Sequence, residues 1–290
     1  MRLSLIVVSY NTRELLASCL DSLVAYLPAI EHEVCVVDNA SKDGSAALVR
    51  ERFPHVRVIE LGENRGFAAA VNVGIAATSG RYVCWLNPDA CLLNDGMGTL
   101  LDYLDAHERT GIVGPRILNP DGSVQHSSRA FPSYATALFN RNSLLTRFFP
   151  RNRFTRSYLN IDRDRDAVQE TDWVSGACLL HRRELGLLDE RFFLYMEDID
   201  FCLRAHNGGW GVAYHPALRV MHRIGGSSRQ MPVRRVVAFH RSIWRYYAKH
   251  FRRNLLLDAA SAAVIWGRCA VMMLEAALFG QSDPHTIRRA

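Results

Sequence analysis

The chain has 290 residues, and its content of 49% hydrophobic and 22% charged residues is typical of a globular protein with a sizeable core. A formal net charge of +6 favours an anionic partner, such as a phosphate-bearing substrate or an acidic membrane surface. The 7 cysteines form no CxxC pair, which indicates reduced thiols in a cytosolic compartment. The apolar run at 3–8 is too short for a signal peptide, and no run of 18 residues is uncharged. We therefore expect neither a leader nor a transmembrane helix.

The first part of the chain alternates between buried strands and amphipathic helices. Strands are predicted at 3–8, 33–37, 56–61 and 81–86, and helices at 13–27, 43–53 and 67–78. This order with short connections predicts an α/β fold, a mostly parallel sheet with helices on both faces. No GxGxxG or GxxxxGKS motif occurs, so neither dinucleotide nor P-loop binding is indicated.

The second part of the chain is less regular. The pattern predicts a helix at 95–108, a strand at 111–118, a strand-like segment at 171–181, a helix at 197–207, and short strands at 211–215 and 218–222. The long irregular region at 119–170 is of a kind that is usually functional or mobile.

The end of the chain predicts two further helices. The first, at 232–253, carries a basic face made of Arg234, Arg241, Arg245, Lys249 and Arg252. The second, at 255–279, is apolar and is broken only by Asp258, Arg268 and Glu275. A basic amphipathic helix with aromatic residues suits an anionic membrane surface. The alternatives are a helix that packs on the domain or on a second subunit.

Polar side chains follow four strands in succession. They are Ser9 and Asn11, Asp38 and Asn39, Asn64 and Arg65, and Asn87 and Asp89. Because the carboxyl ends of parallel strands share one edge of a sheet, we expect these residues to line a nucleotide-sized cleft. Asp89 follows Pro88, where the strand must end, and its carboxylate suits a divalent cation that binds a diphosphate. The alternative is an ordinary turn aspartate.

A series of short motifs carries a resemblance to a known family. In chain order they are Val7-Val8-Ser9-Tyr10-Asn11, the strand end at Asp38, Asn64-Arg65-Gly66-Phe67, Asn87-Pro88-Asp89-Ala90, Trp173-Val174-Ser175-Gly176-Ala177, Tyr195-Met196-Glu197-Asp198-Ile199-Asp200, and His222 ahead of Gly225-Gly226-Ser227. Over roughly residues 3–250 the chain resembles family 2 glycosyltransferases, which have the GT-A fold. It is most similar to bacterial rhamnosyltransferases that act on lipid-linked diphosphate sugars.

The resemblance implies a Rossmann-like GT-A catalytic domain at 1–230 and a C-terminal helical appendage at 231–290. The nucleotide-sugar half would span about 1–118 and the acceptor half about 119–230. The appendage would serve as a membrane-surface or oligomerisation region.

The resemblance also implies roles for individual residues. Asp198 would be the catalytic base, although acids are common in the first turn of any helix. We expect Glu197 and Asp200 to raise the pKa of Asp198 by like-charge repulsion. Asp89 and His222 would bind Mg²⁺ or Mn²⁺, with Asn87 in place of the acid that relatives often carry. The expected substrate and nucleotide contacts are Ser9, Asn11, Asp38, Asn64, Arg65, Asn87, Asp89, Trp173, Gly176, Glu197 and Arg229.

Asp38 is predicted to meet the nucleobase, because a carboxylate accepts a hydrogen bond from the imide N–H that uracil and thymine share. The alternatives are that Asp38 caps a helix and that Arg65 is a surface residue. For Gly225 to Arg229, a flexible linker is the alternative to a phosphate-binding segment.

The implied function is an inverting, metal-dependent glycosyltransferase that uses a dTDP- or UDP-sugar in cell-envelope glycan synthesis. The expected reaction moves rhamnose from dTDP-rhamnose to a polyprenyl-diphosphate-linked or glycan acceptor. The alternatives are another donor, such as UDP-galactofuranose or UDP-glucose, and a non-catalytic nucleotide-binding protein. We expect a cytoplasmic protein, peripheral on the inner face of the cell membrane, with a homodimer as one option for its assembly. The basic and aromatic residues form no RNA- or DNA-binding motif, so nucleic acid is not an expected partner.

Overall fold

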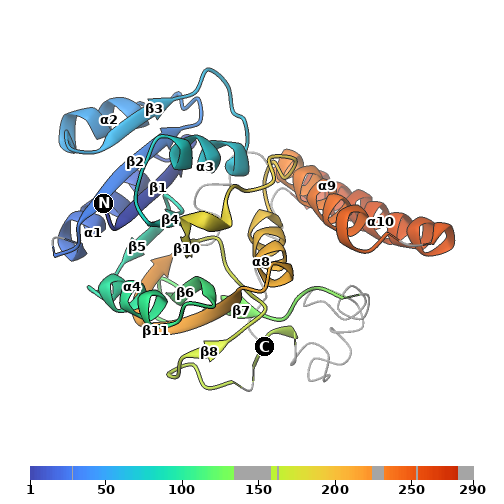
Figure 1. Ribbon diagram of the computed structural model, residues 1–290. Helices are drawn as coiled ribbons and strands as arrows, with labels where there is room; N and C mark the ends of the chain where they lie inside the picture. The colour runs from blue at the N-terminus through green and yellow to red at the C-terminus, as the bar shows by residue number, and fades with distance from the viewer. Residues whose placement is uncertain (28, 134–157, 162, 224–231, 253, 280–290) are drawn as a thin grey trace.

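A mostly parallel sheet lies at the centre of the computed structural model, which describes the chain apart from residues 28, 134–157, 162, 224–231, 253 and 280–290 (Figure 1). Among the described residues it has nine strands in the order β3-β2-β1-β4-β10-β6-β11-β5, with β8 paired to β11. These strands are β1 (Leu3–Ser9), β2 (His32–Asp38), β3 (Arg57–Glu60), β4 (Tyr82–Leu86), β5 (Ala90–Leu92), β6 (Thr110–Leu118), β8 (Gln169–Glu170), β10 (Cys178–Arg182) and β11 (Gly211–His222). A separate ribbon consists of β7 (Ser128–Arg129) and β9 (Trp173–Val174).

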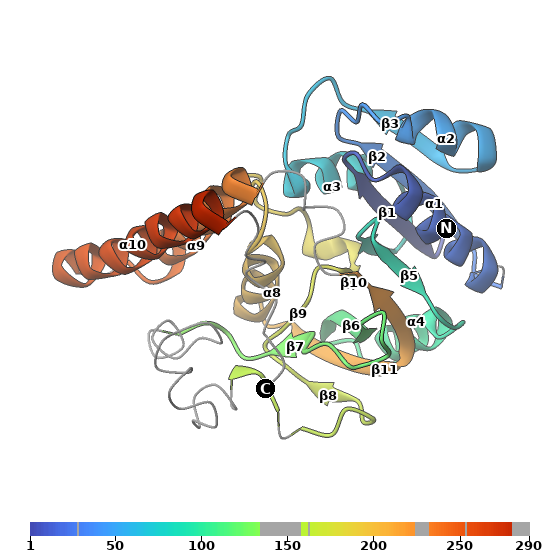
Figure 2. The ribbon, with the colours of Figure 1, turned by 180° about the vertical axis from the view of Figure 1, so that it is seen from behind.

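Helices cover both faces of the sheet, as the sequence predicts (Figures 1 and 2). Side chains of α1 (Arg13–Tyr26), α2 (Ser45–Arg52) and α4 (Met97–Ala106) form one apolar core with the sheet. Side chains of α3 (Phe67–Ala76) and α8 (Glu197–Asn207) form the other. A short 3₁₀ turn, η1 (Arg183–Leu185), follows β10. Because both faces of β1 are covered, all its residues are buried, and its sequence is a continuous apolar run rather than an alternating one.

Strand register aligns the carboxyl ends of the first strands. Ser9 of β1 lies opposite Asp38 of β2, and Asp38 lies opposite Glu60 of β3. On the other side of β1, Val7 lies opposite Leu86, the last residue of β4. The four predicted polar ends therefore lie at one edge of the sheet.

The structure differs from the sequence expectation in the antiparallel strands. The segment predicted as one strand at 171–181 is divided between β9 and β10, and residues 175–177 cross between the two sheets. The two short strands predicted at 211–222 form one strand, β11, with a register shift between His215 and Arg219 around Pro216. The short strand β5 was not predicted, and it pairs antiparallel with β11.

Two C-terminal helices, α9 (Pro232–His250) and α10 (Leu255–Phe279), form a hairpin that extends from the α/β body (Figures 1 and 2). Tyr246 of α9 belongs to the apolar core beside α3 and α8, so α9 packs on the body. The division of the chain at residue 231 stays a prediction.

The stretch Leu255–Leu274 of α10 is long and apolar enough to cross a membrane by length and composition. The stretch contains two charged residues, so the observation that no run of 18 residues is uncharged still holds, and the absence of a transmembrane helix stays a prediction. Asp258 and Arg268 interrupt the uncharged run, but they are too few to make the helix polar.

Candidate active site

The ends of β1 and β2 are joined by hydrogen bonds. Asn11 has a left-handed backbone with φ of 53°, and its side-chain oxygen accepts the Lys42 N–H at 2.7 Å. The Asn11 N–H donates to the Ser41 hydroxyl at 2.9 Å. The hydroxyl of Ser9 lies 2.9 Å from that of Thr12, which precedes α1 without capping it through a side-chain bond. Ser9 and Asn11 are thereby held at the sheet edge, as predicted.

Asp38 combines burial with an unused acceptor. Its side chain accepts the Ser41 N–H on one oxygen at 2.7 Å, and the residue is only 2% exposed. The second oxygen, Oδ2, is buried and has no hydrogen-bond partner among the described residues. An unpaired buried carboxylate oxygen is costly, so Asp38 suits a ligand that brings an N–H donor.

The loop before α3 lies beside Asp38. Asn39 donates to the side-chain oxygen of Asn64 at 3.0 Å and accepts the backbone N–H of Arg65 at 2.9 Å. The Arg65 guanidinium is exposed and lies 3.8 Å from Glu190. These contacts confirm that the ends of β2 and β3 converge with that of β1.

Asp89 and His222 are brought together by the pairing of β5 with β11. His222 lies opposite Ala90 in that pair, so it faces the residue before β5. Its Nε2 lies 3.4 Å from Oδ1 of buried Asp89, and its Nδ1 lies 3.2 Å from Oε1 of Gln125. Gln125 also donates to the backbone oxygen of His222 at 2.8 Å. Sequence reasoning missed Gln125, because nothing near it in the chain marks it as a partner of residue 222.

This pair can offer a cation one carboxylate and one imidazole. In the described part of the chain, no group of three or more His, Cys, Asp or Glu side chains forms a metal-binding cluster. A pair still fits Mg²⁺, which commonly uses one or two protein ligands and takes the rest from phosphate and water. The residues present therefore agree with a cation shared with a diphosphate.

Asp198 lies in the first turn of α8, after two residues with left-handed backbones. Tyr195 and Met196 have φ of 69° and 71°, conformations that cost about 1–3 kcal/mol each for residues other than glycine. The Asp198 carboxylate accepts the backbone N–H of Gly176 at 2.9 Å and that of Ile199 at 2.8 Å. Burial raises the pKa of Asp198, which makes it a better proton acceptor once it is ionised.

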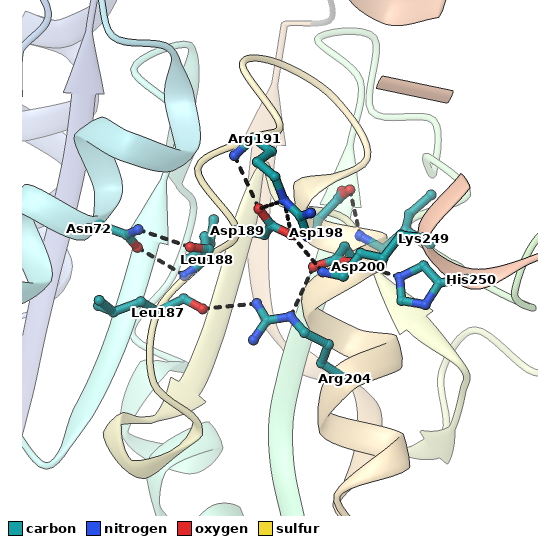
Figure 3. Close-up of polar contacts among 11 residues, drawn as sticks. Asn72, Leu187, Leu188, Asp189, Arg191, Asp198, Asp200, Arg204, Lys249 and His250 are labelled. Atoms are coloured by element: carbon teal, nitrogen blue, oxygen red, sulfur yellow. Dashed lines mark hydrogen bonds and ion pairs between the residues drawn. The ribbon is translucent and has the colours of Figure 1, made fainter. Parts of the chain in front are cut away.

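The neighbouring acids Glu197 and Asp200 have different surroundings. Glu197 is 8% exposed, and burial together with the charge of Asp198 raises its pKa well above the ordinary value. Asp200 is completely buried, and it binds Arg204, Lys249 and His250 (Figure 3). Burial is the largest cause of the raised pKa of Asp198, and the predicted repulsion by Glu197 and Asp200 stays a prediction.

One short segment connects the two sides of the site. The Asn87 N–H, at the end of β4, donates to the Ala177 oxygen at 2.9 Å, and the adjacent Gly176 N–H donates to Asp198. A Cβ on Gly176 would lie 3.1 Å from Cβ of Asp198 and 3.4 Å from the Trp85 indole nitrogen, so glycine permits this close approach. The loop of Asp89 and the predicted base are thus anchored on consecutive residues.

Trp173 and Arg129 form the wall beside this segment. Trp173 is buried, and its indole N–H donates to the Ala130 oxygen at 2.8 Å. The Arg129 guanidinium lies 5.2 Å from the Trp173 ring centroid, and its charge lowers the pKa of Asp198 against the effect of burial. The sequence analysis did not single out Arg129. Arg229 and the Gly225–Gly226–Ser227 motif lie outside the described residues.

Comparisons with known proteins agree with this arrangement. The family model of "Glycosyl transferase family 2" matches residues 4–168. The N-acetylglucosaminyl-diphospho-decaprenol L-rhamnosyltransferase of Mycobacterium tuberculosis is 34% identical over 230 residues, which cover 74% of each chain. A dTDP-rhamnosyl transferase of Shigella flexneri is 24% identical over 252 residues, or 83% of this chain and 75% of the relative.

The fold is shared with solved glycosyltransferases. A mannosyltransferase of Pyrobaculum calidifontis, in complex with GDP-Man and Mn²⁺, superposes with a TM-score of 0.58 at 19% identity. The match covers 97% of this chain and 76% of that one. With the family match and the 34% identical relative, the chain belongs to glycosyltransferase family 2 and has the GT-A fold.

Proposed function

We propose that this glycosyltransferase moves a rhamnosyl group from dTDP-rhamnose to a hydroxyl of a lipid-linked sugar diphosphate, with inversion at the anomeric carbon. The observation that carries the proposal is the segment 176–177, which binds both the Asn87 loop and Asp198. The candidate diphosphate site and the candidate base are therefore both hydrogen-bonded to the same backbone segment. The names of the two relatives above supply the donor and the class of acceptor.

The reaction needs only one proton acceptor. The Asp198 carboxylate takes the proton of the acceptor hydroxyl as that oxygen forms a bond to the anomeric carbon. The bond from this carbon to the diphosphate oxygen breaks, and its electron pair leaves with the nucleoside diphosphate. Because the attack is a single displacement from the face opposite the leaving group, the configuration inverts.

Asp38 would recognise the nucleobase. Its free Oδ2 can accept the imide N–H of thymine, and the same contact fits uracil, so Asp38 does not by itself select dTDP over UDP. Ser9, Asn11, Asn64 and Arg65 surround this position and are proposed to complete the nucleotide site.

Asp89 and His222 would hold a divalent cation, Mg²⁺ or Mn²⁺, near the diphosphate. When bound, the cation would neutralise the negative charge that develops on the leaving diphosphate. Gln125 would hold the His222 ring through Nδ1, as partners of metal-binding histidines commonly do. Asn87 offers an amide where an acid would add charge, so protein charge at this site is small.

The acceptor would lie on the side of Trp173 and Gly176. Arg129 is close enough to Asp198 for its charge to act on that carboxylate, and a guanidinium is well suited to a phosphate. A sugar whose hydroxyl reaches Asp198 could therefore place its own diphosphate near Arg129. Glu197 and Arg229 stay predictions as substrate contacts.

The C-terminal hairpin is suited to an anionic membrane surface on the cytoplasmic side. Arg234, Arg241 and Arg245 are exposed on α9, as predicted for its basic face. The structure removes Lys249 from that face, because Lys249 binds Asp189 and Asp200 in the body. Arg252 lies beyond the end of α9 and pairs with Asp258 of α10, but its side chain stays exposed.

Asp258 and Arg268 of α10 turn toward α9. Asp258 accepts the Tyr247 hydroxyl at 2.8 Å, and the Arg268 guanidinium lies 6.0 Å from the Phe239 ring centroid. Leu255 and Leu256 are 80% and 81% exposed, and Val264, Val271 and Leu274 are also exposed. Because α9 carries exposed arginines, the pair fits a surface position better than a span through the hydrocarbon layer.

The donor assignment predicts which nucleotide sugar stabilises the protein. Only a molecule that binds the folded state raises the melting temperature with concentration. We expect dTDP-rhamnose to do so more strongly than UDP-glucose or UDP-galactofuranose. Transfer to a synthetic N-acetylglucosaminyl diphosphate lipid should give a product whose anomeric configuration, read by NMR, is opposite to that of the donor. Transfer from UDP-glucose alone, or retention of configuration, would contradict the proposal.

Replacement of the base, Asp198→Asn, should lower kcat by about 10²–10⁴-fold, the usual contribution of general-base catalysis. The dissociation constant for dTDP should stay near that of the wild type, because Asp198 contacts the acceptor side. In the wild type, kcat should fall as the pH drops through the raised pKa of Asp198, since protonation removes the base. Asp164→Asn, an exposed carboxylate in the acceptor half, is the matched control. Near-normal turnover in Asp198→Asn would show that another group accepts the proton.

The cation site predicts coupled effects. Asp89→Ala and His222→Ala should each weaken dTDP binding in the presence of Mg²⁺ or Mn²⁺, and the double variant should be little worse than either single one. Calorimetric titration with and without the metal measures both quantities, and Asp95→Ala serves as an exposed control from the turn after β5. If EDTA leaves the affinity of the wild type for dTDP unchanged, Asp89 and His222 do not serve a cation.

The membrane assignment predicts salt-sensitive binding to vesicles. Each basic residue near an anionic surface contributes about 1 kcal/mol, so Arg234, Arg241 and Arg245 should give attachment that weakens as salt rises. We expect co-sedimentation with vesicles rich in phosphatidylglycerol, less with phosphatidylcholine, and a salt-resistant fraction due to α10. Replacement of all three arginines by Gln should remove the salt-sensitive binding and leave only the salt-resistant fraction. If the protein does not bind anionic vesicles at low salt and light scattering shows a dimer, the apolar face of α10 is a subunit interface instead.

A further inference from the structure

The inward face of α9 binds the turn of α8 that carries Asp198. Lys249 Nζ lies 2.7 Å from Oδ1 of Asp200 and 2.7 Å from Oδ2 of Asp189. His250 Nε2 lies 2.8 Å from the same oxygen of Asp200, and Arg204 of α8 binds the other oxygen at 2.9 Å. Figure 3 shows these side chains gathered around Asp200, next to Asp198. Asp200, two residues after the proposed base Asp198, is thus bound by His250 of α9, 50 positions later in the chain.

The same helix also contacts the segment that enters α8. The Ser242 hydroxyl donates to the backbone oxygen of Leu194 at 2.8 Å, and the Phe239 ring packs edge-on against Tyr195 at 5.4 Å. Tyr195 and Met196 are the two residues with left-handed backbones. Strained residues persist where surrounding contacts hold them, and α9 supplies such contacts here.

The start of the segment that leads into α8 is fixed by α3. Asn72 donates to the backbone oxygen of Leu188 at 3.0 Å and accepts its N–H at 2.9 Å, as Figure 3 shows. The segment between residues 188 and 200 is therefore held at its start by α3, while α9 contacts it at Asp189, Leu194 and Asp200.

Asp198 lies between two sites that α9 contacts, Leu194–Tyr195 and Asp200. The described contacts of its carboxylate are backbone N–H groups of Gly176 and Ile199, so its direction follows the position of the first turn of α8. We propose that α9 is a brace for the catalytic base, in which Lys249 and His250 act through Asp200 as positioning residues for Asp198. This proposal rests on the proposed role of Asp198 as the base.

The test compares two cations near the end of α9. Lys249→Met removes the charge that binds Asp200, whereas Arg252→Gln removes a charge that binds Asp258 of α10. We expect Lys249→Met to lower kcat by about tenfold or more, because small displacements of a catalytic group carry large rate costs. Donor KM and the dissociation constant for dTDP should stay unchanged, Lys249→Arg should recover most of the rate, and Arg252→Gln should resemble the wild type.

A structural effect is separated from positioning by a double-variant cycle. If Lys249 acts through Asp198, then Lys249→Met should cause no further loss of kcat in the Asp198→Asn background. An equal loss in both backgrounds, or a loss that matches the unfolded fraction at the assay temperature, would overturn the brace. If Lys249→Met does not fold, Ser242→Ala, which removes one hydrogen bond to Leu194, provides the same comparison.

The outcomes also separate the brace from the proposed function. Full activity in Asp198→Asn would remove the base assignment itself. An inactive Asp198→Asn together with wild-type kcat in folded Lys249→Met and Ser242→Ala would leave the function standing and refute the brace.

Discussion

The crossing segment at residues 175–177 holds the two sides of the active site at a fixed separation. The Ala177 oxygen receives the N–H at the end of β4, and the N–H of Gly176 binds Asp198. Since β10 runs antiparallel between β4 and β6, this segment must leave the sheet at the edge where the parallel strands end. A shift of this backbone segment would therefore move both Asp198 and the loop of Asp89, and reaction rates are sensitive to such shifts in catalytic groups.

The first turn of α8 carries three acids, Glu197, Asp198 and Asp200, which differ in their partners. Glu197 is buried and Asp198 is half-buried, and burial raises the pKa of each. Asp200 is completely buried but has three cationic partners, and removal of one partner from a buried pair typically costs about 3–5 kcal/mol. The helix dipole favours all three acids alike, so their partners rather than the dipole distinguish the proposed base Asp198 from Asp200.

Sequence periodicity predicted the parallel half of the fold well, because β1, β2 and β4 each contain a run of four or five apolar residues close to turn residues. It missed β5, which has three residues, and divided β11 at Pro216, where a register shift lets the strand continue. Strand ends in the sequence placed Asp38 and Asp89 at the correct edge, and the acidic first turn placed Asp198 at the start of α8. Contacts between distant segments, such as Gln125 with His222, carry no local pattern and were not predictable.

Lys249 is a residue for which the sequence pattern predicted the wrong surroundings. Its helical spacing with Arg241 and Arg245 predicted one basic face, yet those two arginines are exposed while Lys249 turns inward. The reason lies on another element, since the buried charge of Asp200 requires a cation and the end of α9 passes beside it. Ser242 and Tyr246, one turn apart, face the body together with Lys249 and His250. The helix therefore has a basic outer face and an inner face specific to α8. Because α10 packs on this helix, any surface that α10 binds is oriented by the contacts that also hold the turn of Asp198.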